Sequence, residues 1–277
     1  NWEILKGLKF KTQFSTYFSS YENNWFVPDY FIEPNDQQLI NFIRRTHNNR
    51  TNNTWNNILT YSKEIKDHSI NVMGGLIMED LEHRTLYGQG QNIPSNTPEL
   101  RYLEAATEGF FSSGNNENYN LISYLGRLNY SYKGKYLLTA TVRADGSSLF
   151  PEDNKWGIFP SVSAAWVLSD EKFIKEDSFI SYLKLRAGWG QIGNDNRNSL
   201  PLDARITTIA NDFYTIGSEQ NLFIATAPGN VGNANLKWET VEDFNLGIDV
   251  KFFDNKLGLN LDVYKRKTFD MLMPKSI

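Results

Sequence analysis

The sequence predicts an all-β fold, an antiparallel transmembrane β-barrel segment of about nine strands. Long stretches alternate strictly between apolar and polar residues, and an alternation of period two places each kind on its own face of a strand. Most of the stretches exceed the roughly five or six residues usual in soluble sheets, and they reach the roughly nine to eleven that cross a bilayer when tilted. Tight turns and long polar loops alternate between them, as in barrels with short periplasmic turns and long extracellular loops.

The clearest strand is 135–147, where Leu138, Ala140 and Val142 share one face and Thr139 lies on the other. A charged side chain on a lipid-facing surface at mid-depth costs about 2–4 kcal/mol, so a membrane barrel is expected to keep charge on one face. A soluble sheet with one buried face would show the same split. In chain order, the predicted strands are 3–20, 54–65, 68–87, 119–132, 135–147, 156–169, 179–192, 237–251 and 256–270.

The connections between these strands alternate in length. Long polar segments at 21–53, 88–118 and 193–236 predict external loops, and the spacing of apolar residues predicts a short helix at 35–48 inside the first. Pro160 lacks a backbone N–H, so it predicts a bulge or a local edge within its strand. Gly and Asn tolerate the positive φ that hairpin turns demand. Tight turns are predicted at Lys66–Asp67, Lys133–Gly134 and Asp254–Asn255.

Composition excludes several classes of protein. The chain of 277 residues has no cysteine, so neither a disulfide framework nor a thiolate metal site is possible. Its net charge is −4 with mixed signs, which argues against a nucleic-acid partner, because nucleic-acid binders usually carry a basic patch. No run of about 18 apolar residues predicts a transmembrane helix.

Charged residues on the polar faces are candidates for a water-filled lumen, because charge there costs little. The opposite, apolar faces are expected to contact outer-membrane lipid. The lumen-facing candidates are Arg143, Asp145, Lys184 and Arg186.

Aromatic residues in the predicted external loops are candidates for contact with a substrate or a partner protein. They could stack on sugar rings or pack on a partner, and the competing interpretation is that they pack on neighbouring loops. These residues are Trp25, Phe26, Tyr30, Phe213, Tyr214 and Phe223.

Catalytic and metal-binding patterns are missing from the sequence. His68 and His83 are too far apart on one strand to share a site, and His47 is predicted in a loop. We therefore expect no enzyme activity, no catalytic residue and no dedicated metal site. The run 194–196 (Asn-Asp-Asn) lacks the ligand spacing of a calcium loop but leaves an opportunistic loop Ca²⁺ open.

Three segments resemble the SusC/RagA-type TonB-dependent outer-membrane transporters. They are residues 135–173 (KYLLTATVRADGSSLFPEDNKWGIFPSVSAAWVLSDEKF), 180–194 (ISYLKLRAGWGQIGN) and 233–272 (NANLKWETVEDFNLGIDVKFFDNKLGLNLDVYKRKTFDML). The resemblance implies a 22-stranded barrel with an N-terminal plug, placed beneath a SusD-like surface lipoprotein and energised through the TonB complex. It also implies import of glycans or peptides across the bacterial outer membrane.

We therefore expect residues 1–277 to be part of a single TonB-dependent receptor β-barrel domain, an internal piece of a longer protein without the plug. Two alternative functions stay open at this stage. One is a passive porin-like channel, and the other is a soluble exported β-sandwich that binds carbohydrate.

Overall fold

The computed structural model describes residues 1–174, 179–195, 206–216, 221–228 and 235–271, and it describes the backbone alone in 206–216 and 221–228. The chain forms two compact units. Unit 1 comprises Asn1–Thr12, Asn56–Ile77 and Leu121–Ile277, and unit 2 comprises Gln13–Trp55 and Met78–Asn120. No helix in the described ranges is long and apolar enough to cross a membrane.

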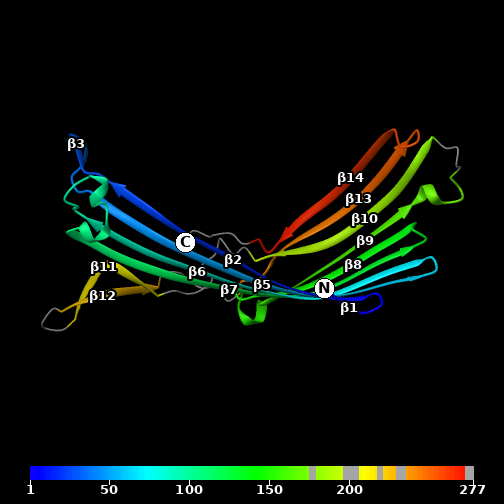
Figure 1. Cartoon of the computed structure of the whole chain (residues 1–277), viewed down its shortest axis with the longest axis horizontal. Helices are drawn as coiled ribbons and strands as arrows, with labels where there is room; N and C mark the ends of the chain where they lie inside the picture. The colour runs from blue at the N-terminus through cyan, green and yellow to red at the C-terminus, as the bar shows by residue number, and fades with distance from the viewer. Residues whose placement is uncertain (175–178, 196–205, 217–220, 229–234, 272–277) are drawn as a thin grey trace. The chain divides into compact units, whose positions relative to one another are not determined.

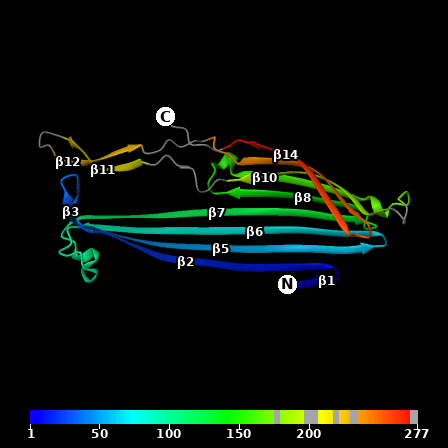
Figure 2. The ribbon, with the colours of Figure 1, turned by 90° about the horizontal axis from the view of Figure 1, so that it is seen from above.

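The main sheet has ten hydrogen-bonded strands, in the order β1-β2-β5-β6-β7-β8-β9-β10-β13-β14. Its strands therefore follow the chain, with two small hairpins inserted, and Figure 2 shows β2, β5, β6 and β7 side by side. The bounds are β1 Trp2–Leu5, β2 Leu8–Val27, β5 Phe42–Ile65, β6 His68–Gln91, β7 Glu108–Tyr132, β8 Tyr136–Ser147, β9 Trp156–Val167, β10 Ile180–Asn194, β13 Glu239–Phe252 and β14 Leu257–Phe269.

The all-β fold and the nine long strands predicted from the alternation are confirmed. The tenth strand arises because the stretch predicted as 3–20 is interrupted by a turn at Gly7, which separates β1 from β2. Gly7 has φ +84°, and a Cβ there would lie 2.3 Å from the backbone oxygen of Ser62. A side chain at this position would therefore clash with the neighbouring strand.

The predicted loop at 21–53 and the helix at 35–48 are wrong in their extent and type. Strand β2 continues to Val27, β5 begins at Phe42, and the hairpin β3 (Tyr30–Glu33) and β4 (Asp36–Gln38) lies between them. Polar residues on both faces hid these strands from the apolar alternation. Their pairing is instead supported by cross-strand hydrogen bonds, including the 3.0 Å bond that Thr16 donates to Asn53.

The predicted loop at 88–118 is also shorter than expected, because β6 continues to Gln91 and β7 begins at Glu108. Two short 3₁₀ helices, η1 (Pro98–Leu100) and η2 (Leu103–Ala105), lie in the remaining connection. The core of unit 2 forms here: Ile43, Ile93 and Ala106 are buried, and Phe26 and Leu103 pack on them.

The buried amide of Asn41 joins the two connections of unit 2. Its side chain donates to the carbonyl of Ile93 at 2.9 Å and accepts from the amide of Ile93 at 2.6 Å. The backbone amide of Asn92 donates to the carbonyl of Asn41 at 3.0 Å. Asn41 thus pairs backbone groups that would otherwise be buried without partners.

In unit 1 the strands β8, β9, β10, β13 and β14 follow one another across the sheet (Figure 1). This part of the sheet has one apolar and one polar face. Directly opposed residues on neighbouring strands point to the same side. The apolar face includes Leu246, Leu261 and Val263, which are 48%, 57% and 65% exposed. No second sheet among the described residues covers these side chains, which does not favour a β-sandwich with stacked apolar faces.

Pro160 lies at a local edge, as the sequence predicted. It pairs with Val142 of β8 across the β8–β9 ladder, whereas the ladder between β9 and β10 ends at the pair of Ser161 and Gly190. The missing N–H of proline therefore leaves no gap in the β9–β10 pairing.

The connection between β10 and β13 contains a further hairpin, formed by β11 (Ile206–Ile216) and β12 (Asn221–Pro228). The connections before and after β9 hold the 3₁₀ helices η3 (Glu152–Asn154) and η4 (Leu168–Asp170).

Candidate functional site

The polar face of unit 1 carries an arginine that links three strands. Arg186 of β10 donates through Nε and Nη2 to both carboxylate oxygens of Asp249 on β13, at 2.9 and 2.8 Å. Its Nη1 also lies 3.1 Å from a carboxylate oxygen of Asp262 on β14. The planar guanidinium suits this forked contact, which fixes the arginine against the wall of the sheet.

Gly247 makes this reach possible. It lies on β13, directly between Arg186 of β10 and Asp262 of β14 in the strand register. A Cβ at Gly247 would lie 2.8 Å from Cζ of Arg186 and 2.6 Å from Oδ1 of Asp262. The guanidinium therefore occupies the space of the absent side chain, a role that the sequence alone did not reveal.

Arg143 and Asp145 lie two residues apart on β8 and pair with each other. Nε of Arg143 donates to the carboxylate of Asp145 at 2.7 Å, and its Nη2 donates to the hydroxyl of Ser123 at 3.1 Å. Asp145 is 7% exposed and Ser123 is fully buried. The carboxylate is committed to the sheet, while the side chain of Arg143 is 42% exposed.

A cavity of about 350 Å³ lies on the polar face. Its lining includes Lys184 and Arg186, together with the polar side chains of Thr139, Ser163 and Asn245. The alternation thus correctly predicted that both cations share the polar face of β10. That this face lines a lumen stays a prediction.

The sequence analysis missed a buried aromatic cluster beside the C-terminal end of β8. Trp238 packs on Phe150 and Phe159 with ring centroids 5.1 and 5.4 Å apart, and its indole donates to the carbonyl of Lys155 at 3.0 Å. A Cβ on Gly193 would overlap the ring of Phe159, so this glycine makes room for the cluster. The cluster fixes the connection between β8 and β9.

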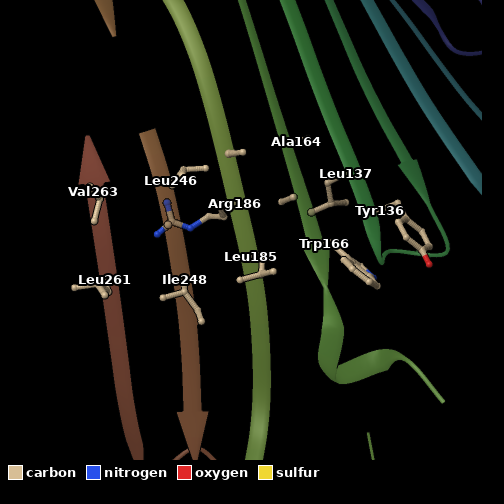
Figure 3. A pocket seen from close by; sticks show the side chains of 13 residues that line it. Tyr136, Leu137, Ala164, Trp166, Leu185, Arg186, Leu246, Ile248, Leu261 and Val263 are labelled. Atoms are coloured by element: carbon tan, nitrogen blue, oxygen red, sulfur yellow. The ribbon is translucent and has the colours of Figure 1, made fainter. Parts of the chain in front are cut away.

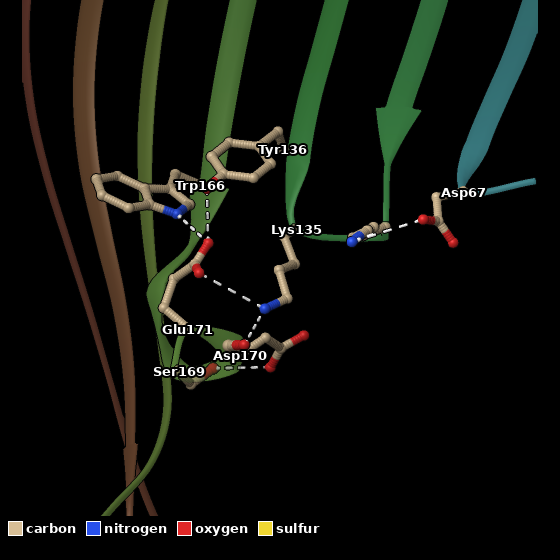
Figure 4. Close-up of polar contacts among 8 residues, drawn as sticks. Asp67, Lys135, Tyr136, Trp166, Ser169, Asp170 and Glu171 are labelled. Atoms are coloured by element: carbon tan, nitrogen blue, oxygen red, sulfur yellow. Dashed lines mark hydrogen bonds and ion pairs between the residues drawn. The ribbon is translucent and has the colours of Figure 1, made fainter. Parts of the chain in front are cut away.

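In the connection that follows β9, Glu171 contacts the side chains of Tyr136, Trp166 and Lys135 (Figure 4). The phenol of Tyr136 donates to Oε1 at 2.8 Å, the indole of Trp166 donates to the same oxygen at 3.1 Å, and Nζ of Lys135 lies 3.6 Å from Oε2. These contacts, that of Tyr136 first, hold the pKa of the Glu171 carboxyl below its usual range. Glu171 therefore stays charged and links the 168–174 connection to β8 and β9.

Trp25 belongs to an aromatic and cationic cluster in unit 2 rather than to a loop. It lies at the end of β2, is 50% exposed, and contacts the edge of Phe42 at 5.6 Å. Cζ of Arg44 lies 5.0 Å from the centroid of Trp25 and 5.2 Å from that of Tyr87. The cation thus supports an indole ring that still presents half of its surface to solvent.

The other aromatic candidates differ in availability. Phe26 packs against the core of unit 2 and lies 4.5 Å from Cζ of Arg101, as the competing packing interpretation held. Tyr30 is 45% exposed on β3. Phe213, Tyr214 and Phe223 lie in β11 and β12, where Tyr214 pairs with Phe223 in the register, but their side chains lie outside the described residues.

The histidines and acidic residues do not assemble into a reaction centre. His68 accepts or donates a 2.8 Å hydrogen bond with the phenol of Tyr130, and His83 lies 3.6 Å from Glu117. No group of three potential metal ligands occurs in the part of the chain that the structure describes. Asp195 is buried and accepts a hydrogen bond from Ser147 at 3.4 Å, whereas Asn196 lies outside the described residues, so a loop Ca²⁺ stays a prediction.

Comparison with known proteins identifies sequence relatives along the whole chain. A sequence model of the family described as TonB dependent receptor-like, beta-barrel matches residues 1–277. The chain is 31% identical over 277 residues to TonB-dependent receptor P3 of Formosa agariphila, a match that covers 100% of this chain and 27% of that protein. It is 35% identical over 225 residues to TonB-dependent receptor SusC of Bacteroides thetaiotaomicron, covering 80% of this chain and 21% of SusC. The chain thus spans about a quarter of the length of these relatives.

Solved structures share the same fold. The structure of the RagAB peptide transporter matches with a TM-score of 0.83 at 22% identity, covering 99% of this chain and 29% of the solved one. The open-open state of the RagAB peptide importer matches with a TM-score of 0.79. At this identity the likeness concerns the fold.

Proposed function

Because this chain belongs to the TonB-dependent receptor β-barrel family, as its sequence predicted, we propose that it forms part of the wall of an outer-membrane nutrient importer. Proteins of this family are outer-membrane β-barrels and act as receptors or transporters. In this role the chain performs no bond chemistry. It provides a polar surface along which a solute passes and an apolar surface that faces lipid.

The observation that carries the proposal is the contrast between the two faces of unit 1. Leu246 and Val263 oppose each other on the apolar face and are left exposed, while Arg186, Asp249 and Asp262 form an ion-pair network on the polar face. Soluble proteins rarely leave such an apolar face exposed to water, whereas in a membrane barrel lipid covers it.

We further propose that the complete protein takes up glycans or peptides together with a SusD-like surface lipoprotein, powered by the TonB complex. The likeness to a structure described as a peptide transporter supports the peptide half of this proposal. The half-exposed Trp25, which Arg44 supports, suits stacking on a ring or an extended chain.

The experiment that tests the proposal is uptake by cells that express the full-length transporter. Labelled oligosaccharides and oligopeptides are supplied to cells with and without a functional TonB. We expect outer-membrane fractionation and TonB-dependent uptake of one of the two classes. Uptake that persists without TonB would support the porin alternative, and release from membranes by carbonate without detergent would exclude the barrel.

The role of Trp25 is tested in the same assay. We expect Trp25→Ala to raise the half-saturating substrate concentration roughly five- to tenfold, as removal of an aromatic contact at an interface does. Trp156→Ala is the matched control, because Trp156 is 47% exposed but lies in β9 on the apolar face. Equal uptake by both variants would remove Trp25 from the substrate path.

A further inference from the structure

The apolar face of unit 1 is not flat, because it contains a groove of about 680 Å³ (Figure 3). Ala164 of β9 and Ala187 of β10 lie directly opposite each other in the strand register. Their small side chains form the floor of the groove. The walls are larger side chains of the same face, namely Trp166, Leu185, Leu246, Ile248, Leu261 and Val263.

A second cavity, of about 540 Å³, lies next to the groove, between the β7–β8 turn and the connection that follows β9. Tyr136 lines both cavities, so the apolar groove and the polar cavity meet at its side chain. The second cavity is rich in amines and aromatic rings. Its lining is Tyr132, Lys133, Lys135, Tyr136, Glu171, Lys172 and Phe173.

The lysines of the second cavity differ in how far they are engaged. Nζ of Lys135 is held by Glu171 and by the carbonyl of Asp170, and Nζ of Lys133 lies 3.6 Å from Asp67. Lys172 is exposed and forms no ion pair with any described residue. Its ammonium is therefore available to an anionic group that arrives from the membrane surface.

We propose that the two cavities together bind one phospholipid molecule, with an acyl chain in the groove over Ala164 and Ala187 and the phosphate beside Lys172. This inference rests on the proposed function, because only a barrel in a membrane presents its apolar face to lipid. The order of side-chain types along β8 and β9 and into their adjoining turns matches such a molecule. Apolar walls give way to Trp166 and Tyr136, and then to amines, in the order in which a lipid passes from hydrocarbon to headgroup.

The alternative occupant is another protein element, such as a second copy of the chain. An apolar protein surface would fill the groove equally well, but it would bury the ammonium of Lys172 without an anion, which is costly. The phosphate of a lipid satisfies that ammonium while it stays at the membrane surface.

The test measures lipid bound to the purified full-length transporter by native mass spectrometry in detergent. Phosphatidylethanolamine and phosphatidylglycerol are added separately as probes. We expect wild-type protein to retain one tightly bound phospholipid. The double variant Ala164→Leu, Ala187→Leu should reduce retention about tenfold, the loss expected when about two methylene groups lose their cover.

Matched controls separate this groove from the rest of the apolar face. Ala144→Leu makes the same substitution at one position on the apolar face of β8, outside the groove, and it should leave retention unchanged. Lys172→Glu should weaken retention of both lipids, whereas Lys256→Glu, in another exposed turn, should not. Equal lipid retention by the double variant and the wild type would overturn the inference. It would also be overturned if the double variant lost a bound second copy of the protein and the wild type carried no lipid.

The uptake assay keeps this inference distinct from the proposed function. If the wild-type transporter imports its substrate but retains no phospholipid, the lipid site is wrong and the importer stands. If the wild-type protein does not enter the outer membrane, the proposed function itself fails.

Discussion

At the scale of single residues, the polar face of unit 1 depends on one absent side chain. Arg186 contacts two carboxylates on two different strands because Gly247 leaves the intervening position open. The interaction is partly exposed, since the side chains of Arg186 and Asp262 are 32% and 41% accessible, so its contribution to stability is modest.

Gly247→Ala should displace the guanidinium and reduce the free energy of unfolding by about 1–2 kcal/mol, the range of a lost charge-assisted hydrogen bond with partial exposure. Urea unfolding of the full-length barrel in detergent, followed by tryptophan fluorescence, measures the change. Gly188→Ala on β10 is the matched control, because a Cβ there has nothing closer than 3.7 Å. Equal effects of the two substitutions would argue against the role assigned to Gly247.

Asn41 offers a second test at a single residue. Asn41→Leu removes both hydrogen bonds to the backbone of Ile93 and leaves that buried amide and carbonyl unpaired, at a cost of about 1–3 kcal/mol for each unsatisfied group. We expect faster hydrogen exchange in residues 92–107 than in wild type. Asn35→Leu, in the exposed turn between β3 and β4, should not change exchange there.

Residue type and alternation predicted the faces of Arg143, Asp145, Lys184 and Arg186, but not their partners. A period of two assigns each side chain to a face from local sequence alone. Asp249 and Asp262, the partners of Arg186, follow it by 63 and 76 residues in the sequence, and they meet it only through the register between the strands. No local pattern encodes that register, and the significance of Gly247 follows only from it.

At the scale of elements, the strands that the sequence located are those whose one face is apolar. The ends of β2, β5, β6 and β7 escaped prediction because their pairing uses Thr and Asn side chains, such as the 2.8 Å bond from Thr85 to Asn48. Composition of this kind is typical of loops, and only cross-strand pairing reveals it as sheet.

The connection after β9 should respond to acid. The lowered pKa of Glu171 means that its contacts with Tyr136 and Trp166 stabilise the folded state above the ordinary glutamate pKa, and that this contribution is lost as the pH falls through the lowered pKa. Hydrogen exchange of residues 168–174, corrected for intrinsic rates, should therefore increase as the pH falls below the ordinary glutamate pKa. Glu171→Gln should remove this pH dependence, while the exposed Glu99→Gln should retain it.

At the scale of the whole molecule, an arginine introduced on the apolar face of the sheet should cost far more stability than one introduced on the polar face. Leu246→Arg places a charge on the apolar face and should cost about 2–4 kcal/mol if lipid covers that face. Its neighbour Asn245→Arg points to the polar face and should cost much less. The yield of folded transporter in the outer membrane and its urea midpoint measure both. A soluble protein would tolerate Leu246→Arg, because its side chain is already 48% exposed.

The fold class and the family could be predicted from the sequence because both depend on patterns that are continuous along the chain. The solute class could not, because the aromatic candidates are spread over separate connections. Trp25, Phe26 and Tyr30 look alike in the sequence, yet Phe26 is packed in a core while the other two are exposed.

The length of the central strands has a consequence for the cell that carries this protein. Strands β5 and β6 contain 24 residues each and β7 contains 25, whereas roughly nine to eleven suffice to cross the hydrocarbon. In an outer-membrane barrel, more than half of each strand would therefore extend beyond the hydrocarbon, where lipid does not constrain the side chains. Substitutions in such stretches would then leave insertion into the membrane intact, whereas a charge on the lipid-facing part of the same strand would not.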